Sequence, residues 1–372
     1  MRRALNVFWI ILIFVGFTDC TDYSDSTYFN GEIREIDSRK KEVKEVKLKS
    51  VVLDGAYFGS IAVHDSLMIF WNPKLQSHFF NIFNLDTGEE IGSFCNKGQG
   101  PDEVVAISIM YQIFEEGNEL KTLLFAANEK KILIWNITRS LAEHTTVIDT
   151  IIPYSCNTKD MGACYDYIFR QSEDILFTHI PSMTLNDEDA SLPFYQERTL
   201  YSDKTLMNYP IFRRSIKNDK ASIIPEAFFN SIDAFKPSGS KIAQVMKRLH
   251  QLNIIDTETG EVIGYRLAGS PDFTIFKKKN AIINTNFVRV QADDQYIYAS
   301  FWGRESWGRF DIPSVNIIHV FDWNGKWLYE LITDQPVHEM WLDKVRNRLY
   351  TTNVETDEVF YLDLNEIILT GR

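Results

Sequence analysis

Apolar and polar residues alternate in short runs along most of this chain, and turn residues separate the runs. The clearest unit is an apolar run, a turn that contains Asp or Asn and ends in Gly, and a second alternating run. It occurs three times, at 80–94, 252–267 and 317–332. Such alternation is typical of strands, and a glycine supplies the positive φ that a tight hairpin needs. We therefore expect antiparallel hairpins that turn at Gly88, Gly260 and Gly325.

The three copies share a downstream proline and a regular spacing. Pro101 follows Gly88 by thirteen residues, and Pro271 and Pro336 follow Gly260 and Gly325 by eleven. Gly88 and Gly260 are 172 residues apart, or four units of 43, and Gly325 lies 65 further on. Four-stranded propeller blades repeat about every 40–50 residues. The spacing predicts six blades, at 54–100, 104–153, 164–213, 231–270, 284–333 and 337–366.

The last predicted blade has three strands of its own, at 337–342, 347–352 and 358–364. An early strand within 32–52 is left unassigned, and pairing it into the last blade would close the ring without an open edge. The sequence thus predicts an all-β protein, a six-bladed β-propeller at 32–366 that is closed by an N-terminal strand. Residues 367–372 would form a C-terminal tail.

The N-terminus has the features of an export signal. Arg2 and Arg3 precede fourteen mostly apolar residues at 4–17, which is too short for a membrane span of about 20 residues. We expect residues 1–19 to be a signal peptide and Cys20 to be acylated, although Phe17 and Asp19 depart from the usual lipoprotein pattern. The alternative is a plain secretory signal that leaves Cys20 as an ordinary thiol. Residues 20–31 would be a polar tether.

Composition excludes two classes of protein. With 45% apolar and 13% aromatic residues the chain is not disordered, and with a net charge of −12 and no long basic stripe it is not a nucleic-acid binder. The Lys- and Arg-rich stretch at 39–49 is interrupted by glutamates and alternates with valines. It is interpreted as the solvated face of an edge strand.

Cysteine usage offers one candidate disulfide. Cys95, Cys156 and Cys164 remain after Cys20, and Cys156 and Cys164 are close enough in the chain to bridge in a loop. The alternative is three free or buried thiols. No Cys/His spacing indicates zinc, and we expect neither a metal nor a cofactor.

The acceptor-like Cys20, the repeated hairpins and the segment 98–103 (GQGPDE) carry a resemblance to a known family. The chain resembles the TolB-like six-bladed propeller lipoproteins of Bacteroides-type bacteria, which often show a G-x-G-P-G-E-like segment after the first clear blade. Here Asp102 stands at the position of a family glycine. The resemblance implies a lipid-anchored location in the cell envelope, at the outer membrane or facing the periplasm, and says little about activity.

In a propeller blade whose strands run A to D from the centre outward, the D–A and B–C connections share one face. Segment 98–103 is a D–A connection, and the longest B–C insertions are 302–313 and 181–196. Long loops in a compact repeat are often functional. The first insertion carries aromatic and guanidinium groups that suit sugars, carboxylates or a protein partner: Trp302, Arg304, Trp307 and Arg309. Alternatively, the tryptophans pack over a blade edge.

Other candidate residues have a structural alternative as well. Asp102, Glu103 and Asp272 could contact a ligand or cap backbone amides of the blade connections. A further set of polar residues falls on or near A strands, where some propeller hydrolases hold a cation: His64, His338, Glu339 and Asp343. No pattern fixes four convergent ligands, so satisfied or solvated residues are the favoured interpretation, with His338 kept as a ligand candidate.

These observations favour a non-catalytic binding or scaffold protein, and no residue is assigned a catalytic role. The chain lacks a nucleophile elbow, a zinc-protease motif and a P-loop. Expected partners are a membrane, through the lipid, and a glycan, a peptide or an envelope protein. The alternative function is a metal-dependent hydrolase or lyase that acts on a carbohydrate or lactone in the central channel.

Overall fold

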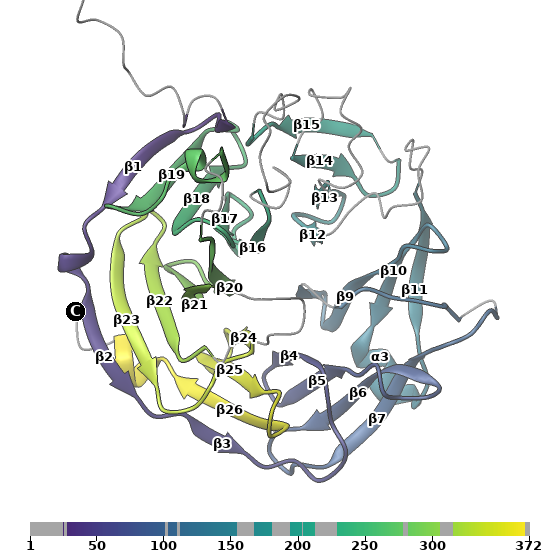
Figure 1. Cartoon of the computed structure of the whole chain (residues 1–372). Helices are drawn as coiled ribbons and strands as arrows, with labels where there is room; N and C mark the ends of the chain where they lie inside the picture. Colours follow the sequence, from purple (N-terminus) through teal and green to yellow (C-terminus); the bar gives the residue numbers. More distant parts are fainter. Residues whose placement is uncertain are drawn as a thin grey trace, which may run out of the picture.

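The computed structural model describes residues 25, 28–100, 103–109, 112–154, 167–180, 194–202, 204–212, 229–277, 282–305 and 315–368. Its strands form six sheets arranged in a ring (Figure 1). Apart from strands contributed by residues 32–51, each sheet falls within one of the six blade ranges expected from the sequence. The predicted all-β, six-bladed propeller is therefore confirmed.

Each blade has four antiparallel strands, A to D, from the channel to the rim. Blade 1 contains β4 (Ser60–His64), β5 (Leu67–Trp71), β6 (His78–Asn84) and β7 (Glu90–Asn96). Blade 2 contains β8 (Ile113–Glu116), β9 (Glu119–Ala126), β10 (Lys131–Asn136) and β11 (Ile148–Pro153), with helix α3 (Ile137–Glu143) before β11. Blade 3 contains β12 (Tyr167–Arg170), β13 (Ile175–His179), β14 (Tyr195–Thr199) and β15 (Thr205–Tyr209).

The second half of the ring follows the same plan. Blade 4 contains β16 (Ser231–Phe235), β17 (Lys241–Met246), β18 (Gln251–Asp256) and β19 (Val262–Leu267), followed by the 3₁₀ helix η3 (Phe273–Lys277). Blade 5 contains β20 (Asn284–Ala292), β21 (Tyr296–Glu305), β22 (Ile317–Asp322) and β23 (Trp327–Thr333). Blade 6 contains β24 (Glu339–Asp343), β25 (Arg348–Asn353) and β26 (Glu358–Asp363), followed by α5 (Asn365–Ile368).

An N-terminal strand closes the ring, as predicted. Strand β3 (Lys49–Val51) pairs antiparallel with β26, with Ser50 opposite Phe360, and supplies the D strand of blade 6. The first and last parts of the chain are therefore hydrogen-bonded within one sheet. This closure removes the open edge that an incomplete last blade would present.

Two further N-terminal strands were not expected. Strand β1 (Glu32–Ile36) pairs in parallel with β19, and β2 (Glu42–Val46) pairs in parallel with β23, with the short 3₁₀ helix η1 (Ser38–Lys40) between them. The N-terminal segment thus runs round the outside of blades 4, 5 and 6 (Figure 1). The spacing of the repeats could not predict β1 and β2, because an additional outermost strand leaves the number of blades unchanged. The edge-strand interpretation of 39–49 is borne out by β2.

The three repeated hairpins turn where the sequence predicted. Gly88, Gly260 and Gly325 have φ of 80°, 75° and 76°. In each turn an Asx side chain caps the backbone: the Oδ1 atoms of Asn84, Asp256 and Asp322 accept amide hydrogen bonds of 2.8–3.1 Å from residues two positions on. The repeated unit is therefore a capped C–D turn.

Apolar cores lie between neighbouring blades. One cluster joins blades 1, 2 and 6, and the others join the remaining adjacent pairs. Trp135 is fully buried, stacks on Phe80 at 5.0 Å between ring centroids and donates its indole N–H to Ser140 Oγ at 3.0 Å. Packing of blade against blade therefore supplies most of the buried apolar surface.

The folded body extends into the expected 20–31 tether. Tyr28 and Phe29 are 2% and 1% exposed, and Phe29 lies 5.9 Å from the Phe212 ring and 6.0 Å from the Phe273 ring. Phe212 is in the D–A connection from blade 3 to blade 4, and Phe273 is in the connection from blade 4 to blade 5. Two aromatic residues in a mostly polar segment thus anchor it to the ring.

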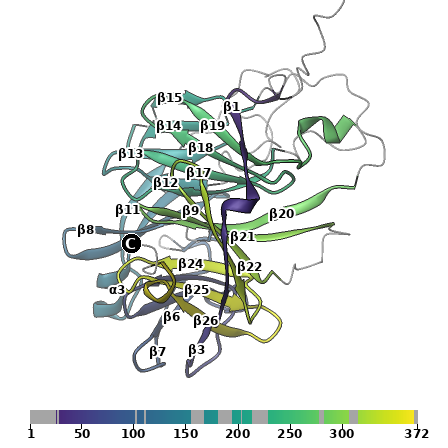
Figure 2. The same cartoon turned by 90° about the vertical axis from the view of Figure 1, so that its left-hand side faces the viewer.

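We call the face with the A–B and C–D turns the turn face, and the face with the B–C and D–A connections the loop face. Figure 2 shows the ring from the side, with the β8–β9 hairpin toward the turn face and the outer ends of β20 and β21 toward the loop face. Among the described residues, no helix is long and apolar enough to cross a membrane. The expected signal peptide at 1–19, Cys20, Cys156 and Cys164 lie outside the described residues, whereas Cys95 is a buried thiol.

Candidate functional site

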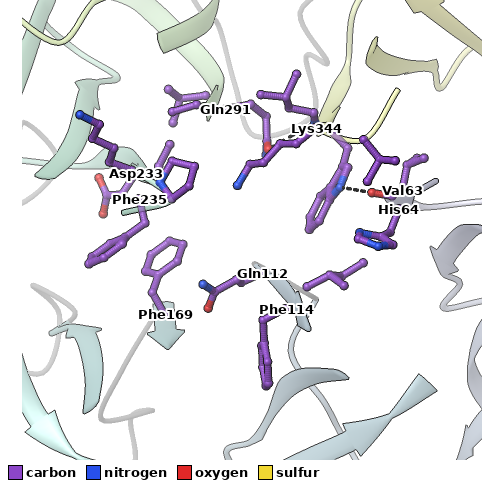
Figure 3. Close-up of a pocket in the computed structure, with 18 of the residues that line it drawn as sticks. Val63, His64, Gln112, Phe114, Phe169, Asp233, Phe235, Gln291 and Lys344 are labelled. Atoms are coloured by element: carbon purple, nitrogen blue, oxygen red, sulfur yellow. Dashed lines mark hydrogen bonds between the residues drawn. The ribbon is translucent and has the colours of Figure 1, made fainter. Parts of the chain in front are cut away.

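The A strands of all six blades surround a central channel that contains a cavity of about 190 Å³. Its lining includes His64 at the end of β4, Phe235 at the end of β16 and Ala292 at the end of β20. A strands run from the loop face to the turn face, so these positions place the cavity toward the turn face. Figure 3 shows its lining residues.

Lys344 lines this cavity together with the ionisable residues Glu115, Asp233 and Lys236. It follows β24 directly and extends toward the middle of the channel (Figure 3). Although the side chain is exposed to the channel, the surrounding walls disfavour the charged form and lower its pKa, while Asp294 and Asp293 partly oppose this shift. Among the described residues, the ammonium makes no hydrogen bond or ion pair. It is therefore available to an anionic ligand.

Two inter-blade contacts fix the polar wall near Lys344. His64 Nε2 lies 3.1 Å from Glu115 Oε1, which joins blade 1 to blade 2. The Gln112 amide is held at both ends by the Arg170 backbone, since Nε2 donates to Arg170 O at 3.0 Å and Oε1 accepts from Arg170 N at 2.7 Å. Both contacts tie neighbouring A strands together and orient the groups that face the channel.

A second layer supports this wall. Glu116 accepts from Arg170 Nη2 at 2.6 Å and from Lys121 Nζ at 2.9 Å, and these two cations lower the pKa of its carboxyl group. The Arg170 guanidinium also lies 4.2 Å from the centre of the Phe114 ring. A cation between a carboxylate and an aromatic face is well fixed, so the β8 and β12 side of the channel is rigid.

One side of the cavity is aromatic. Phe169 of blade 3 and Phe235 of blade 4 stack with their centroids 5.6 Å apart and an interplanar angle of 21°. Together with Phe114 they give the cavity an apolar wall opposite to Lys344 (Figure 3). A site of this kind suits a ligand with one charged end and one apolar face.

Toward the loop face the channel contains an ion pair. Arg289 on β20 makes a two-pronged contact with Glu339 at the start of β24, and the Nε–Oε2 distance is 2.9 Å. Neighbouring His338 is 4% exposed and accepts from Val354 N at its Nδ1 at 3.2 Å; burial lowers its pKa. The sequence candidates Glu339 and His338 therefore both have structural partners.

Asp343 has a structural role in the turn after β24. Its Oδ1 accepts from the amide of Val345 at 3.0 Å and, more weakly, from that of Asp65 in blade 1 at 3.4 Å. Within the described part of the chain, no three His, Cys, Asp or Glu side chains come together as a metal site.

The loop-face candidates belong to several different blades. Trp302 and Arg304 lie on β21, which continues to Glu305, so this part of the expected loop is strand; Trp307 and Arg309 lie outside the described residues. Trp302 is half-buried and Arg304 is exposed.

The acidic loop-face candidates serve as caps where they are described. Glu103 accepts from Gly100 N at 2.9 Å, and Asp272 accepts from Thr274 N at 2.8 Å and also contacts the Thr274 hydroxyl. Asp102 lies outside the described residues. These contacts fit the structural alternative given for each residue, and ligand binding by either stays a prediction.

Sequence reasoning passed over Lys344, Gln112 and Gln291, which share the channel cavity. Lys344 lies in the stretch Asp343–Arg348, where its charge looks like that of any solvated turn. The sequence did place Lys344 in the A–B turn of the last predicted blade. That this turn faces the channel cavity is seen only when the six A strands are placed around the channel.

Comparison with known proteins agrees with this architecture. A family model described as TolB-like 6-blade propeller-like matches residues 40–344. A member of the DUF4221 family from Bacteroides vulgatus has a similar structure, with a TM-score of 0.58 and 11% identity over 85% of this chain and 95% of that chain. A Bacteroides fragilis protein inferred to be exported gives a TM-score of 0.50 and 12% identity over 88% and 98%. No curated protein matches the sequence.

Proposed function

The chain belongs to the TolB-like six-bladed propeller family, and from that premise we propose that it is an exported, non-catalytic binding protein of the cell envelope. Its ligand is a small solute that carries a carboxylate. The ligand binds in the central channel near the turn face, with the carboxylate at Lys344 and an apolar part against Phe169 and Phe235.

The position of Lys344 is the observation that supports this proposal. An ammonium that is partly desolvated and makes no ion pair with a described residue gains more from a bound anion than a fully hydrated lysine does. The lysine is also held on the short turn that follows β24, whose Asp343 caps the backbone. A fixed cation in a cavity favours anions by charge and by geometry.

The dimensions of the cavity limit the ligand. A volume of about 190 Å³ is below the roughly 300–1,000 Å³ of pockets that enclose drug-sized molecules. The occupant is therefore a small acid or the acidic end of a longer molecule. The Phe169–Phe235 wall favours a ring or a sugar face over a fully polar anion.

Export and anchoring are proposed from the N-terminal sequence. The basic start, the short apolar stretch and Cys20 fit a lipoprotein signal, and the Bacteroides fragilis protein inferred to be exported shares the fold. A lipid on Cys20 would hold the propeller at a membrane surface. Its channel would then collect solutes from the adjacent aqueous compartment.

A ligand panel in thermal unfolding tests the binding site. We expect sugar acids such as glucuronate to raise the Tm and the matched neutral sugar glucose to leave it unchanged, since a ligand at 100 times its Kd stabilises by about 2.7 kcal/mol. Lys344→Gln should abolish the shift, and Lys344→Arg should keep part of it. An equal response to both sugars, or an unchanged response in Lys344→Gln, would overturn the proposal.

A further inference from the structure

Asp25, the first residue that the structure describes, is held to blade 4 by an ion pair with a buried arginine. Arg266 on β19 donates from Nη1 and Nη2 to the two carboxylate oxygens of Asp25, at 2.8 and 2.9 Å. The Arg266 side chain is 8% exposed, and its guanidinium also lies 5.4 Å from the centre of the Phe273 ring. A two-pronged contact to a buried guanidinium fixes Asp25 in position as well as in direction.

This ion pair is the outer end of a hydrogen-bond chain that crosses the blade. Arg266 Nε donates to Gln251 at 2.9 Å, Gln251 to Asn253 at 2.6 Å, Asn253 to Gln244 at 2.7 Å, and Gln244 to the Tyr195 hydroxyl at 2.6 Å. The three amide side chains are fully buried. Because each side chain in this chain is hydrogen-bonded to the next, the position of Arg266, which binds Asp25, is rigid.

The docked segment lies on the loop-face side of the rim. Tyr28 and Phe29, just after Asp25, pack against Phe212 and Phe273, which belong to D–A connections. Figure 2 shows the start of the N-terminal segment on that side of the ring, ahead of β1. The described residues of this N-terminal segment therefore lie between blades 3 and 4, on the loop-face side.

From these positions we infer that the membrane lies against the loop-face side of the rim at blades 3 and 4, so that the channel cavity opens away from the membrane. This inference rests on the proposed lipid at Cys20. Asp25 is five positions after Cys20, and an extended chain spans at most about 3.3–3.6 Å per residue, or about 17 Å in all. A lipid on so short a connection holds the loop-face rim at the bilayer surface.

In this orientation the cavity is accessible from the aqueous solution. The lining of the cavity is concentrated at the turn-face ends of β4, β16, β20 and β24. A propeller bound by its loop-face rim presents these ends to the solution, where solutes diffuse. The ring thereby acts as a spacer between the membrane and the ligand site.

Two single-cysteine reporters at the ends of β20 test this orientation. Ile282→Cys is on the loop-face side and Gln295→Cys on the turn-face side; both residues are exposed, and the nine-residue strand between them spans about 30 Å. Cys156 and Cys164 are replaced by serine in both proteins, and the buried Cys95 is retained. Each lipidated protein is labelled with a fluorophore and bound to phosphatidylethanolamine–phosphatidylglycerol vesicles that carry a headgroup quencher.

We expect quenching at position 282 to exceed quenching at position 295 several-fold. Insertion of a flexible linker of about twenty Gly and Ser residues between Thr21 and Asp22 should remove this difference, because such a linker reaches about 25 Å on average. Equal or reversed quenching in the vesicle-bound protein would overturn the orientation. Failure of the protein to float with vesicles, as expected for Cys20→Ser, would instead refute the anchor on which the inference rests.

Discussion

At the scale of single residues, two histidines, His319 fully buried and His250 half-buried, make the fold sensitive to acid. His250 and His319 lie with their ring centroids 4.5 and 4.3 Å from that of Phe301, in the aromatic cluster of blades 4 and 5. Burial lowers the pKa of His250 to about 3 and that of His319 to about 4. Both rings are therefore neutral in the native protein at neutral pH.

The pH dependence of stability follows from these directions. Because both pKa values are lower in the folded than in the unfolded chain, the unfolded chain binds protons first as the pH falls below about 6.5. We expect the free energy of unfolding to decrease from pH 6.5 toward pH 4, by up to about 1.4 kcal/mol per pH unit for each histidine. Urea unfolding at several pH values measures this slope.

Matched variants assign the slope to the cluster. His319→Gln should make it shallower, although the variant also loses packing against Phe301 and Trp327. His144→Asn changes an exposed helix C-cap with φ of 53°, a conformation that asparagine tolerates, and should leave the slope as it is. A wild-type stability that does not change between pH 6.5 and pH 4.5 would contradict this account.

Residues whose role depends on their immediate chain neighbours could be identified from the sequence. Residues whose role depends on several blades meeting in space could not. Gly88, Gly260 and Gly325 were found because a tight turn demands a glycine at a fixed place. Lys344 was missed because its importance comes from facing five other blades. Trp302 was selected as part of an expected B–C loop that carries aromatic and guanidinium groups, whereas it lies on β21.

At the scale of elements, the C–D hairpin is the repeated device that shapes the blades. A Cβ atom added to Gly325 would lie 2.2–2.3 Å from ring atoms of Tyr265, in addition to the strain of a positive φ of 76°. Gly117, in the β8–β9 turn, has φ of 64° but no atom within 4 Å of an added Cβ. The two glycines therefore separate steric crowding from backbone strain.

We expect Gly325→Ala to lose about 2–4 kcal/mol of unfolding free energy, the sum of backbone strain and overpacking. Gly117→Ala should lose only about 1 kcal/mol. Guanidinium unfolding of the two variants beside the wild type measures the difference. Equal losses of unfolding free energy in the two variants would show that Tyr265 moves aside. The contact with Tyr265 would then add nothing to the cost of backbone strain.

Strand pairing of the N-terminal segment could be predicted only where a blade lacked one of its four strands. The incomplete last blade demanded an N-terminal partner, which is β3. Strands β1 and β2 add to blades that are already complete, so no shortfall indicated them. The burial of Tyr28 and Phe29 was missed for a similar reason, since two aromatic residues give no period.

At the scale of the whole molecule, stability depends on the seam where β3 meets β26. Lys49 and Tyr361 are paired across this seam, at a partly exposed site. A disulfide between Lys49→Cys and Tyr361→Cys would close a covalent loop around the ring. Because such a bond restricts the unfolded chain more when the loop is longer, we expect the oxidised form to gain about 2–4 kcal/mol.

The reduced form of the same double variant is the control for this prediction. Both forms have the same two substitutions, so their difference in Tm reports only the cross-link. Failure of the disulfide to form under mild oxidation would contradict the pairing of β3 with β26. An oxidised form no more stable than the reduced form would show that the seam does not limit unfolding.

The proposed carboxylate site in the channel near the turn face can be examined directly in a crystal. The most direct measurement is a crystal structure of the protein with the acid that gives the largest thermal shift. The account predicts ligand density among Lys344, Phe169 and Phe235, with a carboxylate oxygen within hydrogen-bond distance of Lys344 Nζ. Ligand density on the loop face beside Trp302 and Arg304, with none in the channel, would contradict it.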